Sequence, residues 1–294
     1  MLFSPLDCVA LQLGRFSAFA VLILQVWLSA TACPAITRSD AVRVESVASE
    51  IDSVFVVGEE LTYNVSYASV DIGQVRIKVV DKVQRGGKTS YKTLAYIDSY
   101  RGVPFVNIHT TYESLISESL YSRWFQARVK DGSSWHRFVY NYDYPHGSVS
   151  IEQTDETSGR VEKRDTLHIE SPYQDGLSMF YLARCRIQSS QPVNVPVVVN
   201  ERKGSAFLDF KNERKNETID AVDYPLNVTY FSGRADFVGI FGLTGEFEGW
   251  FSNDGARVPI LAKMKVLLGN IRIELMKWKR EGWSPPRYYE ADHK

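Results

Sequence analysis

The chain predicts a mainly β fold of the α+β class, in which a curved antiparallel or barrel-like sheet carries one short helix. Apolar and polar residues alternate with a period of two along most of the chain, as in strands that bury one face. Turn residues separate many of these runs, and a single segment shows helical spacing instead. Short strands joined by hairpin turns form antiparallel sheets, which can leave one face in water.

Residues 1–32 have the features of a secretory signal peptide. Arg15 precedes an apolar run from Phe16 to Leu28, and Ala30 and Ala32 supply the small residues of a cleavage site. A membrane-spanning anchor is the alternative, because about 17 apolar residues are enough to cross a bilayer. Gln25 and the small-residue end favour cleavage. We therefore expect an exported protein in the periplasm or associated with the cell envelope.

Cys33 stands where a bacterial lipoprotein signal places its lipidated cysteine. A lipobox prefers Leu three residues earlier, whereas this chain has Ala30 there, so lipid attachment and simple cleavage after Ala32 both stay open. Membrane contact is expected only through the signal or a lipid on Cys33. Without the lipid, Cys33 and Cys185 could form a disulfide in an oxidising compartment. One cysteine pair is no scaffold, so the core must hold the fold.

The mature chain divides into three parts. Residues 33–57 are polar and weakly patterned, which predicts a flexible tether. Residues 58–278 carry the strand pattern and predict a single β-rich domain, a size that one core can support. Residues 279–294 include Trp283-Ser-Pro-Pro-Arg287, which cannot continue a strand, and predict a disordered tail.

Strand character is clearest where the predicted domain begins. Leu61, Tyr63, Val65 and Tyr67 alternate with polar residues, so an extended strand would have one apolar face. Turns such as Asn253-Asp-Gly255 separate later strands. Further strands are predicted at 74–79, 92–97, 120–130, 135–141, 148–154, 160–168, 193–199, 205–211, 226–231, 245–252, 258–266 and 270–278.

One segment breaks the period of two. Leu177, Phe180, Tyr181 and Arg184 follow one another at spacings of three and four, and Asp175 precedes them as a candidate N-cap. The spacing predicts one short helix packed against the sheet. Such a helix could also act as a lid over a ligand.

Composition excludes two classes of protein. The chain has 294 residues, 44% of them hydrophobic, so it can bury a core and is not intrinsically disordered. Its 34 basic and 35 acidic side chains balance to a net charge of -1. Binding nucleic acid requires a basic surface, so no nucleic-acid partner is expected.

No pattern of catalytic residues is present, and we predict a protein that is not an enzyme and needs no cofactor. Ser178 lies inside the predicted helix and lacks the second glycine of a nucleophile elbow. Glu246 and Glu248 share one strand face, where solvated glutamates are common. The histidines are scattered without a local ligand spacing, so no metal site is predicted. They are His109, His136, His146, His168 and His293.

Aromatic residues provide the candidate binding residues. Trp124 and Trp250 fall on the polar side of their strands, where water is expected. Together with Tyr140 and Tyr142, they are our candidate wall for an apolar or carbohydrate ligand, because concave sites combine aromatic walls with a few polar groups. The alternative is that both faces of the sheet are covered, which would make these residues part of the core.

Several segments resemble one family. Gly58-Glu-Glu-Leu-Thr-Tyr63 is followed by Ile72-Gly73, Asp175-Gly-Leu-Ser-Met-Phe-Tyr-Leu-Ala-Arg184 forms the predicted helix, and Gly249-Trp-Phe-Ser-Asn-Asp254 precedes Arg257-Val-Pro-Ile260. In this order they resemble the DUF3108 family of uncharacterised exported bacterial proteins. The resemblance implies a secreted or periplasmic β-rich domain and brings no established activity or catalytic residue.

Three functions fit these observations. The first is a non-enzymatic cell-envelope protein that binds or carries a hydrophobic, lipid-like ligand in a concave sheet. The second is a structural or assembly factor that docks to another envelope protein through a sheet edge. The third is an envelope hydrolase, which has the least support because no catalytic constellation is present.

Overall fold

In the computed structural model of the protein, the described residues are 50–103, 107–239, 244–266 and 269–290. They form one sheet of fourteen strands in the order β8-β7-β6-β5-β4-β3-β2-β1-β14-β13-β12-β11-β10-β9, and every neighbouring pair is antiparallel. The predicted mainly β fold with an antiparallel sheet is confirmed. The predicted signal peptide and Cys33 lie outside the described residues.

The strands follow the alternating sequence pattern. Those of the first half are β1 (Glu60–Tyr67), β2 (Val70–Arg85), β3 (Lys88–Ser99), β4 (His109–Ser117), β5 (Ser122–Asp131), β6 (Ser134–Asp143), β7 (Ser148–Asp155) and β8 (Val161–His168). Those of the second half are β9 (Val193–Val199), β10 (Arg202–Glu217), β11 (Leu226–Ala235), β12 (Gly245–Ser252), β13 (Pro259–Val266) and β14 (Gly269–Lys279). In β1 every second residue from Leu61 to Val65 is buried, so one face of the strand faces the core.

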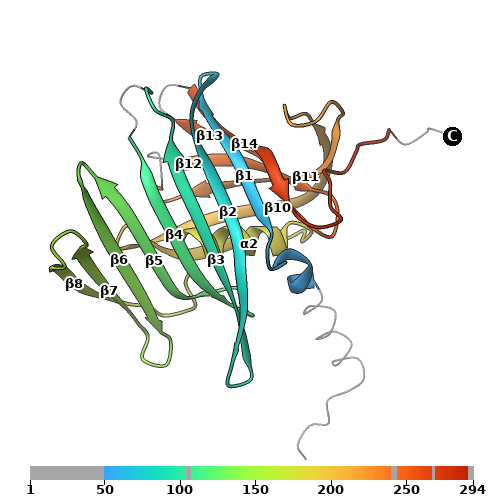
Figure 1. Ribbon diagram of the computed structural model, residues 1–294. Helices are drawn as coiled ribbons and strands as arrows, with labels where there is room; N and C mark the ends of the chain where they lie inside the picture. The colour runs from blue at the N-terminus through green and yellow to red at the C-terminus, as the bar shows by residue number, and fades with distance from the viewer. Residues whose placement is uncertain (1–49, 104–106, 240–243, 267–268, 291–294) are drawn as a thin grey trace, which may run out of the picture. The chain divides into compact units, whose positions relative to one another are not determined.

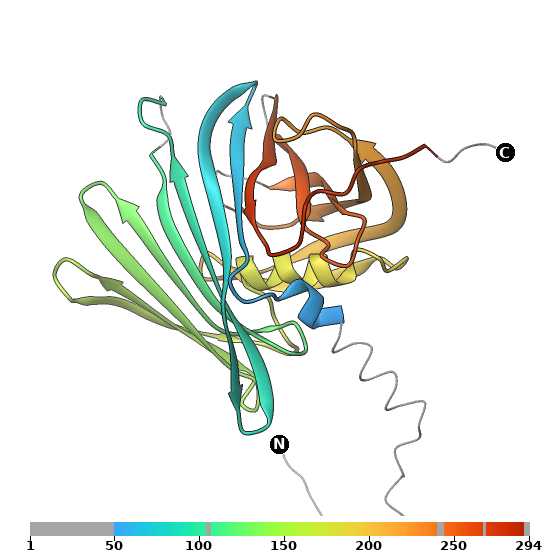
Figure 2. The same cartoon turned by 45° about the vertical axis from the view of Figure 1, so that its right-hand side comes forward.

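The sheet curls around helix α2 (Gly176–Arg186), as Figures 1 and 2 show from two directions. Leu177 and Tyr181 pack with residues of β1 to β4, whereas Ala183 and Ile187 pack with residues of β9 to β12. Because both halves of the sheet contact one helix, the face that carries α2 is the concave face. The other face is called the outer face below.

The two edge strands, β8 and β9, are not hydrogen-bonded to each other in the described part of the chain, so the barrel is open. The connection from β8 to α2 crosses this opening. Gln174 N donates to Pro196 O at 2.9 Å, and Val198 N donates to Gln174 O at 2.8 Å, which joins the connection to β9. Ser122 N donates to Tyr173 O at 3.1 Å, which joins it to β5. One strap therefore links the two ends of the sheet.

Helix α2 begins at the predicted N-cap. The carboxylate of Asp175 accepts the backbone N–H groups of Leu177 and Ser178, and Ser178 Oγ accepts from Asp175 N at 2.7 Å, which completes a capping box. The second carboxylate oxygen accepts hydrogen bonds from Ser114 at 2.6 Å and Ser122 at 2.5 Å. These bonds fix the start of the helix to strands β4 and β5.

The ordered body is larger than the sequence pattern predicted. Residues 50–54 form a helical turn, and Phe55 stacks between Tyr91 and Tyr181 at ring distances of 4.2 and 4.5 Å. The predicted tether over 33–57 is therefore wrong for its last eight residues, because burial of Val54 and Phe55 holds them in place. The sequence pattern missed them because this short segment has no strand period.

The predicted disordered tail over 279–294 is also wrong for the part that the structure describes. Trp283 Nε1 donates to Asp254 Oδ2 at 2.8 Å, and Tyr288 N donates to Pro225 O at 2.8 Å. Arg287 forms an antiparallel bridge with Leu226. The prolines end strand β14, but side chains and backbone after them still dock on the body.

Candidate functional site

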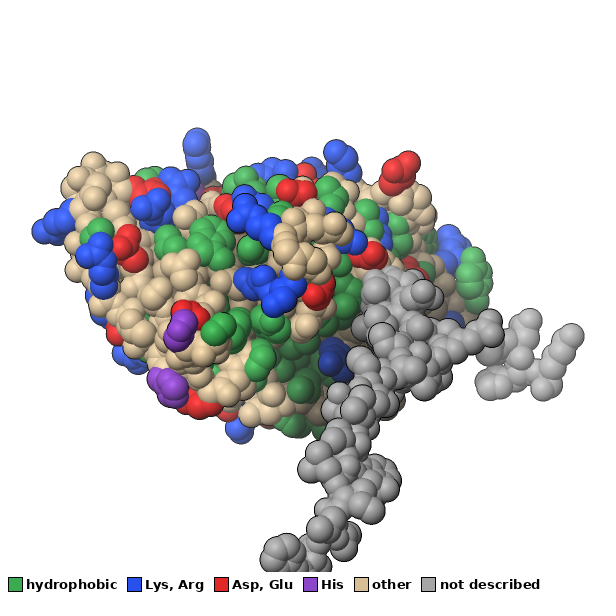
Figure 3. Space-filling view, turned by 90° about the horizontal axis from the view of Figure 1, so that it is seen from below, with side chains coloured by type: hydrophobic (Ala, Val, Ile, Leu, Met, Phe, Trp, Pro, Cys, Tyr) green, Lys and Arg blue, Asp and Glu red, His purple; other side chains and the backbone are tan. Residues whose placement is uncertain are grey.

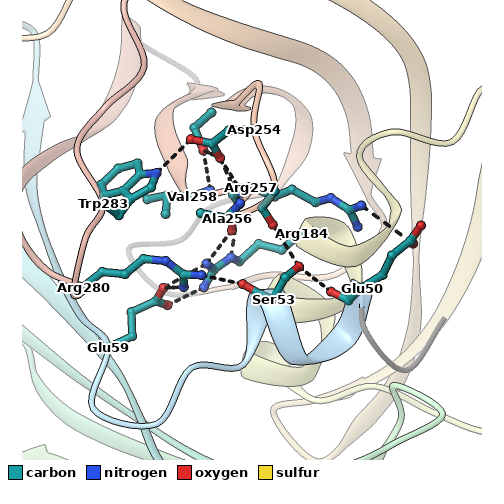
Figure 4. Close-up of polar contacts among 12 residues, drawn as sticks. Glu50, Ser53, Glu59, Arg184, Asp254, Ala256, Arg257, Val258, Arg280 and Trp283 are labelled. Carbon is teal, nitrogen blue, oxygen red and sulfur yellow. Dashed lines mark hydrogen bonds and ion pairs between the residues drawn. The ribbon is translucent and has the colours of Figure 1, made fainter. Parts of the chain in front are cut away.

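A buried ion-pair network lies where the C-terminal half of α2 meets the sheet (Figure 4). Arg184 Nη1 donates to Glu59 Oε1 at 2.6 Å, and Arg184 Nη2 donates to Glu59 Oε2 at 3.1 Å. Arg184 also donates to the backbone carbonyls of Arg257 and Ala256 at 3.1 and 3.0 Å. Arg280 donates to the same carboxylate of Glu59. The carboxylate of Glu59 thus bridges two guanidinium groups.

The turn between β12 and β13 holds the other side of this network. Asp254 Oδ1 accepts the backbone N–H groups of Ala256 and Arg257 at 3.0 and 3.1 Å. Arg257 in turn donates to the carbonyl of Cys185 in the last turn of α2 at 3.1 Å and to Oε1 of Gln188, just after the helix, at 2.8 Å. The turn is therefore fixed to the C-terminal end of the helix.

Electrostatics keep Glu59 charged although it is buried. Burial alone would raise the pKa of its carboxyl, but Arg184 and Arg280 outweigh that effect and lower the pKa below its ordinary value. The side chains of Arg184 and Glu59 are 0% and 1% exposed. No substrate could reach this pair, so the network is a structural anchor.

Helix α2 is held at both ends, by its capping bonds to β4 and β5 and by this ion-pair network. The helix therefore fills part of the concave face as a fixed element. Its role as a lid stays a prediction.

The part of the concave face that α2 leaves uncovered is the candidate ligand site. Helix α2 contacts mainly β3, β4 and β9, and its N-cap Asp175 is bonded to Ser122 at the start of β5. On strands β4 to β8, half-buried apolar side chains pack beside buried ones on the same face, which include Phe125 and Tyr140. We call these half-buried side chains the wing surface: Tyr112, Val129, Phe138, Tyr142 and Leu167.

Strand register places the wing surface on one face. Tyr112 pairs with Ala127, and Ala127 pairs with Phe138 on the next strand, so the three side chains form a row across β4, β5 and β6. Val129 pairs with His136 in the adjacent row. The ring of Tyr112 contacts that of Phe125 edge to face at 5.2 Å, and a Cβ at Gly176 in α2 would lie 4.0 Å from it. The row therefore begins at the helix and runs outward from it.

Two of the predicted site residues belong to this concave face. Tyr140 is buried between Phe138 and Tyr142 on the same face of β6, and its hydroxyl donates to Glu201 Oε1 in the turn between β9 and β10 at 2.6 Å. Tyr142 is half buried two residues farther along β6. Burial raises the pKa of both hydroxyls, so they stay protonated. Tyr140 and Tyr142 can supply hydrogen bonds and apolar rings, but no phenolate base.

The two predicted tryptophans lie on the outer face and far from each other in strand order. Trp124 on β5 is half buried and pairs with Leu115 and Asn141. Trp250 on β12 is 4% exposed, because Tyr230 packs at 5.4 Å and Lys263 Nζ lies 4.8 Å over its ring. The structure therefore does not bring them together with Tyr140 and Tyr142. Alternation predicted water beside both tryptophans, and it could not show which neighbours cover Trp250.

Sequence reasoning did not single out Val129 or Phe138. Val129 alternates with polar residues, as most strand residues of this chain do, and Phe138 stands between Arg137 and Val139, so the period alone gave neither a distinction. Their distinguishing feature is the absence of helix α2 above them, which depends on tertiary structure. A sequence pattern carries no signal for that feature.

Titratable groups outside the anchor are mostly paired. His109, His136 and His146 contact the carboxylates of Asp98, Glu162 and Asp143 at 2.8, 3.0 and 2.8 Å. No group of three metal-ligating side chains occurs in the described ranges. Ser178 serves the helix cap and has a carboxylate neighbour. On the face seen in Figure 3, basic and acidic side chains are scattered among hydrophobic ones, in line with the balanced net charge.

None of the helices in the described part of the chain is both long and apolar enough to span a membrane.

Residues 62–276 match the family model described as protein of unknown function DUF3108. No curated protein matches the sequence.

Solved structures resemble the chain with low identity. A β-barrel-like protein of the DUF1849 domain from Brucella abortus has 10% identity and a TM-score of 0.49, and the match covers 77% of this chain and 98% of that one. A protein from Bacteroides fragilis, described as exported with a YmcC-like fold, has 8% identity and a TM-score of 0.34, with 76% and 96% covered. A protein from Parabacteroides distasonis described as a lipoprotein has 6% identity and a TM-score of 0.29, again with 76% and 96% covered.

Proposed function

The chain belongs to the DUF3108 family, whose function is unknown, and from this premise we propose that it is an exported, non-enzymatic protein that binds a hydrophobic, lipid-like ligand. The ligand lies on the wing surface of the concave face. The observation that carries the proposal is the row of apolar side chains Tyr112, Ala127 and Phe138, which begins beside helix α2 and runs outward to half-buried Phe138.

Burial of apolar surface supplies the binding energy. Each square ångström of apolar surface removed from water contributes about 25 cal/mol, so covering half-exposed Val129 and Phe138 favours an acyl chain or a similar apolar group. Phe125 and Tyr140, buried on the same face at a ring distance of 5.4 Å, pack beside this surface and hold it in place. Binding requires no covalent step.

Polar groups at the edge of the wing surface can orient the ligand. The hydroxyl of Tyr140 is bound to Glu201, and that of Tyr144 donates to the carbonyl of Ser122 at 2.5 Å. His136 and Glu162 form a further polar pair next to Val129. A ligand with an apolar body and one polar end fits such a surface best.

The observed sheet edges disfavour the alternative of an assembly factor that adds a partner strand. Edge strand β8 exposes the charged run Glu162-Lys163-Arg164, which opposes pairing with another strand. The other edge strand, β9, contains Pro196 and is already joined to Gln174 of the strap. Both edges have features that natural sheets use against edge pairing.

Binding of the fluorescent fatty acid cis-parinaric acid tests the proposal. Phe138→Asp places a charge in the wing surface, and we expect the dissociation constant to rise at least tenfold, because burial of the charge costs more than binding gains. The control is Phe207→Asp, since Phe207 is a 44% exposed phenylalanine on the outer face. Circular dichroism verifies that each variant is folded.

Two results would contradict the proposal. The first is that the unaltered protein does not bind the fatty acid at all. The second is that Phe138→Asp and Phe207→Asp weaken binding equally. Native mass spectrometry of protein purified gently from the envelope fraction adds an independent readout, because a bound lipid would be identified by its mass, whereas a co-purified polypeptide would favour the assembly factor.

A further inference from the structure

A polar groove crosses the outer face of the sheet, on the side opposite to the wing surface. It consists of two adjoining hollows of about 1130 and 460 Å³, which share Lys263 and Asn270. The larger hollow extends over β14 and β1 to Tyr100, and the smaller one extends over β12 and β11 to Phe207. Neither hollow belongs to the site proposed above.

One row of paired residues forms the floor of the groove. Each member pairs with the next across a strand boundary, so the row runs at right angles to six strands from β1 to β10. With neighbouring strands 4.7–4.9 Å apart, its five steps span about 24 Å. The row is Ser66, Arg272, Lys263, Glu248, Ser232 and Asp209.

The loop after β10 forms a fixed wall of the larger hollow. Asp220 N donates to Glu274 Oε1 at 2.6 Å, and Arg272 Nη2 donates to Thr218 O at 3.3 Å. Arg272 and Glu274 are also paired with each other. These contacts hold the loop against β14, so the hollow is preformed.

The opposite end of the larger hollow is a chain of oriented polar groups. Tyr100 donates to Asn64 Oδ1 at 3.1 Å, and Asn64 Nδ2 donates to Asp71 Oδ1 at 2.6 Å. Oxygen atoms of Asp71 therefore face the groove with a fixed orientation. Such a group can accept hydrogen bonds from hydroxyls of a ligand.

The centre of the groove holds a cation with spare hydrogen-bonding capacity. Lys263 Nζ lies over the ring of Trp250 and makes no ion pair with any carboxylate in the described ranges. Glu248, which opposes Lys263 on β12, accepts a hydrogen bond from Tyr230 at 2.9 Å and keeps its second oxygen for another donor. The floor thus offers both donors and acceptors.

We infer that this groove binds a linear oligosaccharide. Saccharide hydroxyls both donate and accept, which matches a preformed row of carboxylates, amides, hydroxyls and cations. Phe207, 44% exposed at one end, offers an aromatic face against which a sugar ring can lie.

Other ligand classes fit this groove less well. The carboxylates of Asp209, Glu246 and Glu248 would repel a nucleic acid. An acyl chain would find charged groups in place of an apolar wall. A peptide cannot add as a strand, because the backbone groups of the floor are already paired within the sheet.

Isothermal titration calorimetry with N-acetylglucosamine tetramer, cellotetraose and maltotetraose tests the inference. The double variant Lys263→Met with Glu248→Gln removes both charges and keeps unbranched side chains of similar length, so that the methionine can still cover Trp250. We expect it to weaken binding of the preferred tetrasaccharide at least tenfold. The matched control is Lys92→Met with Glu113→Gln, an outer-face pair at 2.7 Å on β3 and β4, outside the groove, which should bind as the unaltered protein does.

Absence of binding by all three tetrasaccharides would overturn the inference, and so would an equal loss in the control variant. Thermal unfolding of both double variants verifies that a loss is not due to unfolding. The inference is separable from the proposed function, because Phe138→Asp should leave saccharide binding unchanged. Conversely, the groove variant should leave binding of cis-parinaric acid unchanged.

Discussion

Arg184 donates two hydrogen bonds to the carboxylate of Glu59, 125 positions earlier in the chain, and neither side chain is exposed to solvent. The pair links α2 to the residue just before β1. Arg280 joins the same carboxylate from the residue after β14. Three distant segments of the chain therefore meet in one buried ionic group, which fixes α2 to the ends of the neighbouring strands β1 and β14.

Removal of Arg184 should destabilise the protein strongly. In Arg184→Met the carboxylate of Glu59 keeps only Arg280 as an ionic partner in a buried site. Breaking a buried ion pair from one side typically costs about 3–5 kcal/mol. Urea unfolding followed by tryptophan fluorescence should show this loss in the free energy of unfolding.

The double variant Arg184→Met with Glu59→Gln is the control for that measurement. Because it leaves no unpaired carboxylate, it should be more stable than Arg184→Met alone. Equal stability of the two would show that packing around the arginine, and not the charge of Glu59, dominates the effect. Removing the half-exposed pair Lys92 and Glu113 should cost at most about 1 kcal/mol.

The same carboxylate makes stability depend on pH. Burial raises the pKa of Glu59, but Arg184 and Arg280 together lower it below the ordinary value of 4.5. The folded form therefore binds the proton more weakly than the unfolded form does. Its contribution is complete above pH 4.5 and is lost as the pH falls through the folded pKa.

Urea titrations at several pH values between 3 and 7 measure this dependence. The free energy of unfolding of the unaltered protein should fall below pH 4.5, and Glu59→Gln should show a smaller fall. Glu170→Gln is the control. The hydrogen bond from Lys203 lowers the pKa of the Glu170 carboxyl to about 2, but this carboxyl lies on the surface, in contrast to that of Glu59. Parallel curves for Glu59→Gln and the unaltered protein would contradict the assignment.

Gly249 should not tolerate a side chain. A Cβ at this position would overlap the ring of Phe231, its partner on β11, and this ring is held by Phe210 and Phe251 at 5.7 and 5.2 Å. Overpacking of a core costs about 1–3 kcal/mol, so Gly249→Ala should lower the melting temperature. Gly255→Ala is the control, since nothing lies within 4 Å of its added carbon.

Adding Phe231→Leu to Gly249→Ala should recover part of the lost stability, because it removes the overlapping ring. A melting temperature of Gly249→Ala equal to that of Gly255→Ala would show that the ring of Phe231 moves aside freely.

The period of two in the sequence predicted nearly every strand, because alternate burial is a local property that each strand shows by itself. Leu61 and Tyr63 carry that signal directly, and Asp175 carries the local signal of an N-cap. Phe55 and Trp283 have no such local signal, because each packs against residues that are distant in the chain. The pattern therefore underestimated both ends of the body.

The candidate sites show the same division. Alternation placed Trp124 and Trp250 on the polar side of their strands, where water is expected, but Trp250 is 4% exposed. It could not reveal that Phe138 lies beyond the reach of α2, or that Lys263 and Glu248 align with residues of four other strands. Strand order and helix placement decide these features, and both depend on contacts across the whole sheet.

The thiol of Cys185 should react slowly in the folded protein. Burial raises its pKa to about 11, although Arg184 and Arg257 lie nearby and oppose this shift. The thiolate is the reactive form, so at pH 7.5 the folded thiol should react about a hundredfold more slowly than in the unfolded chain. Timed alkylation with iodoacetamide, followed by mass spectrometry of the peptide that contains Cys185, measures both rates. Equal rates with and without urea would show an accessible thiol, and a disulfide to Cys33 would then become feasible.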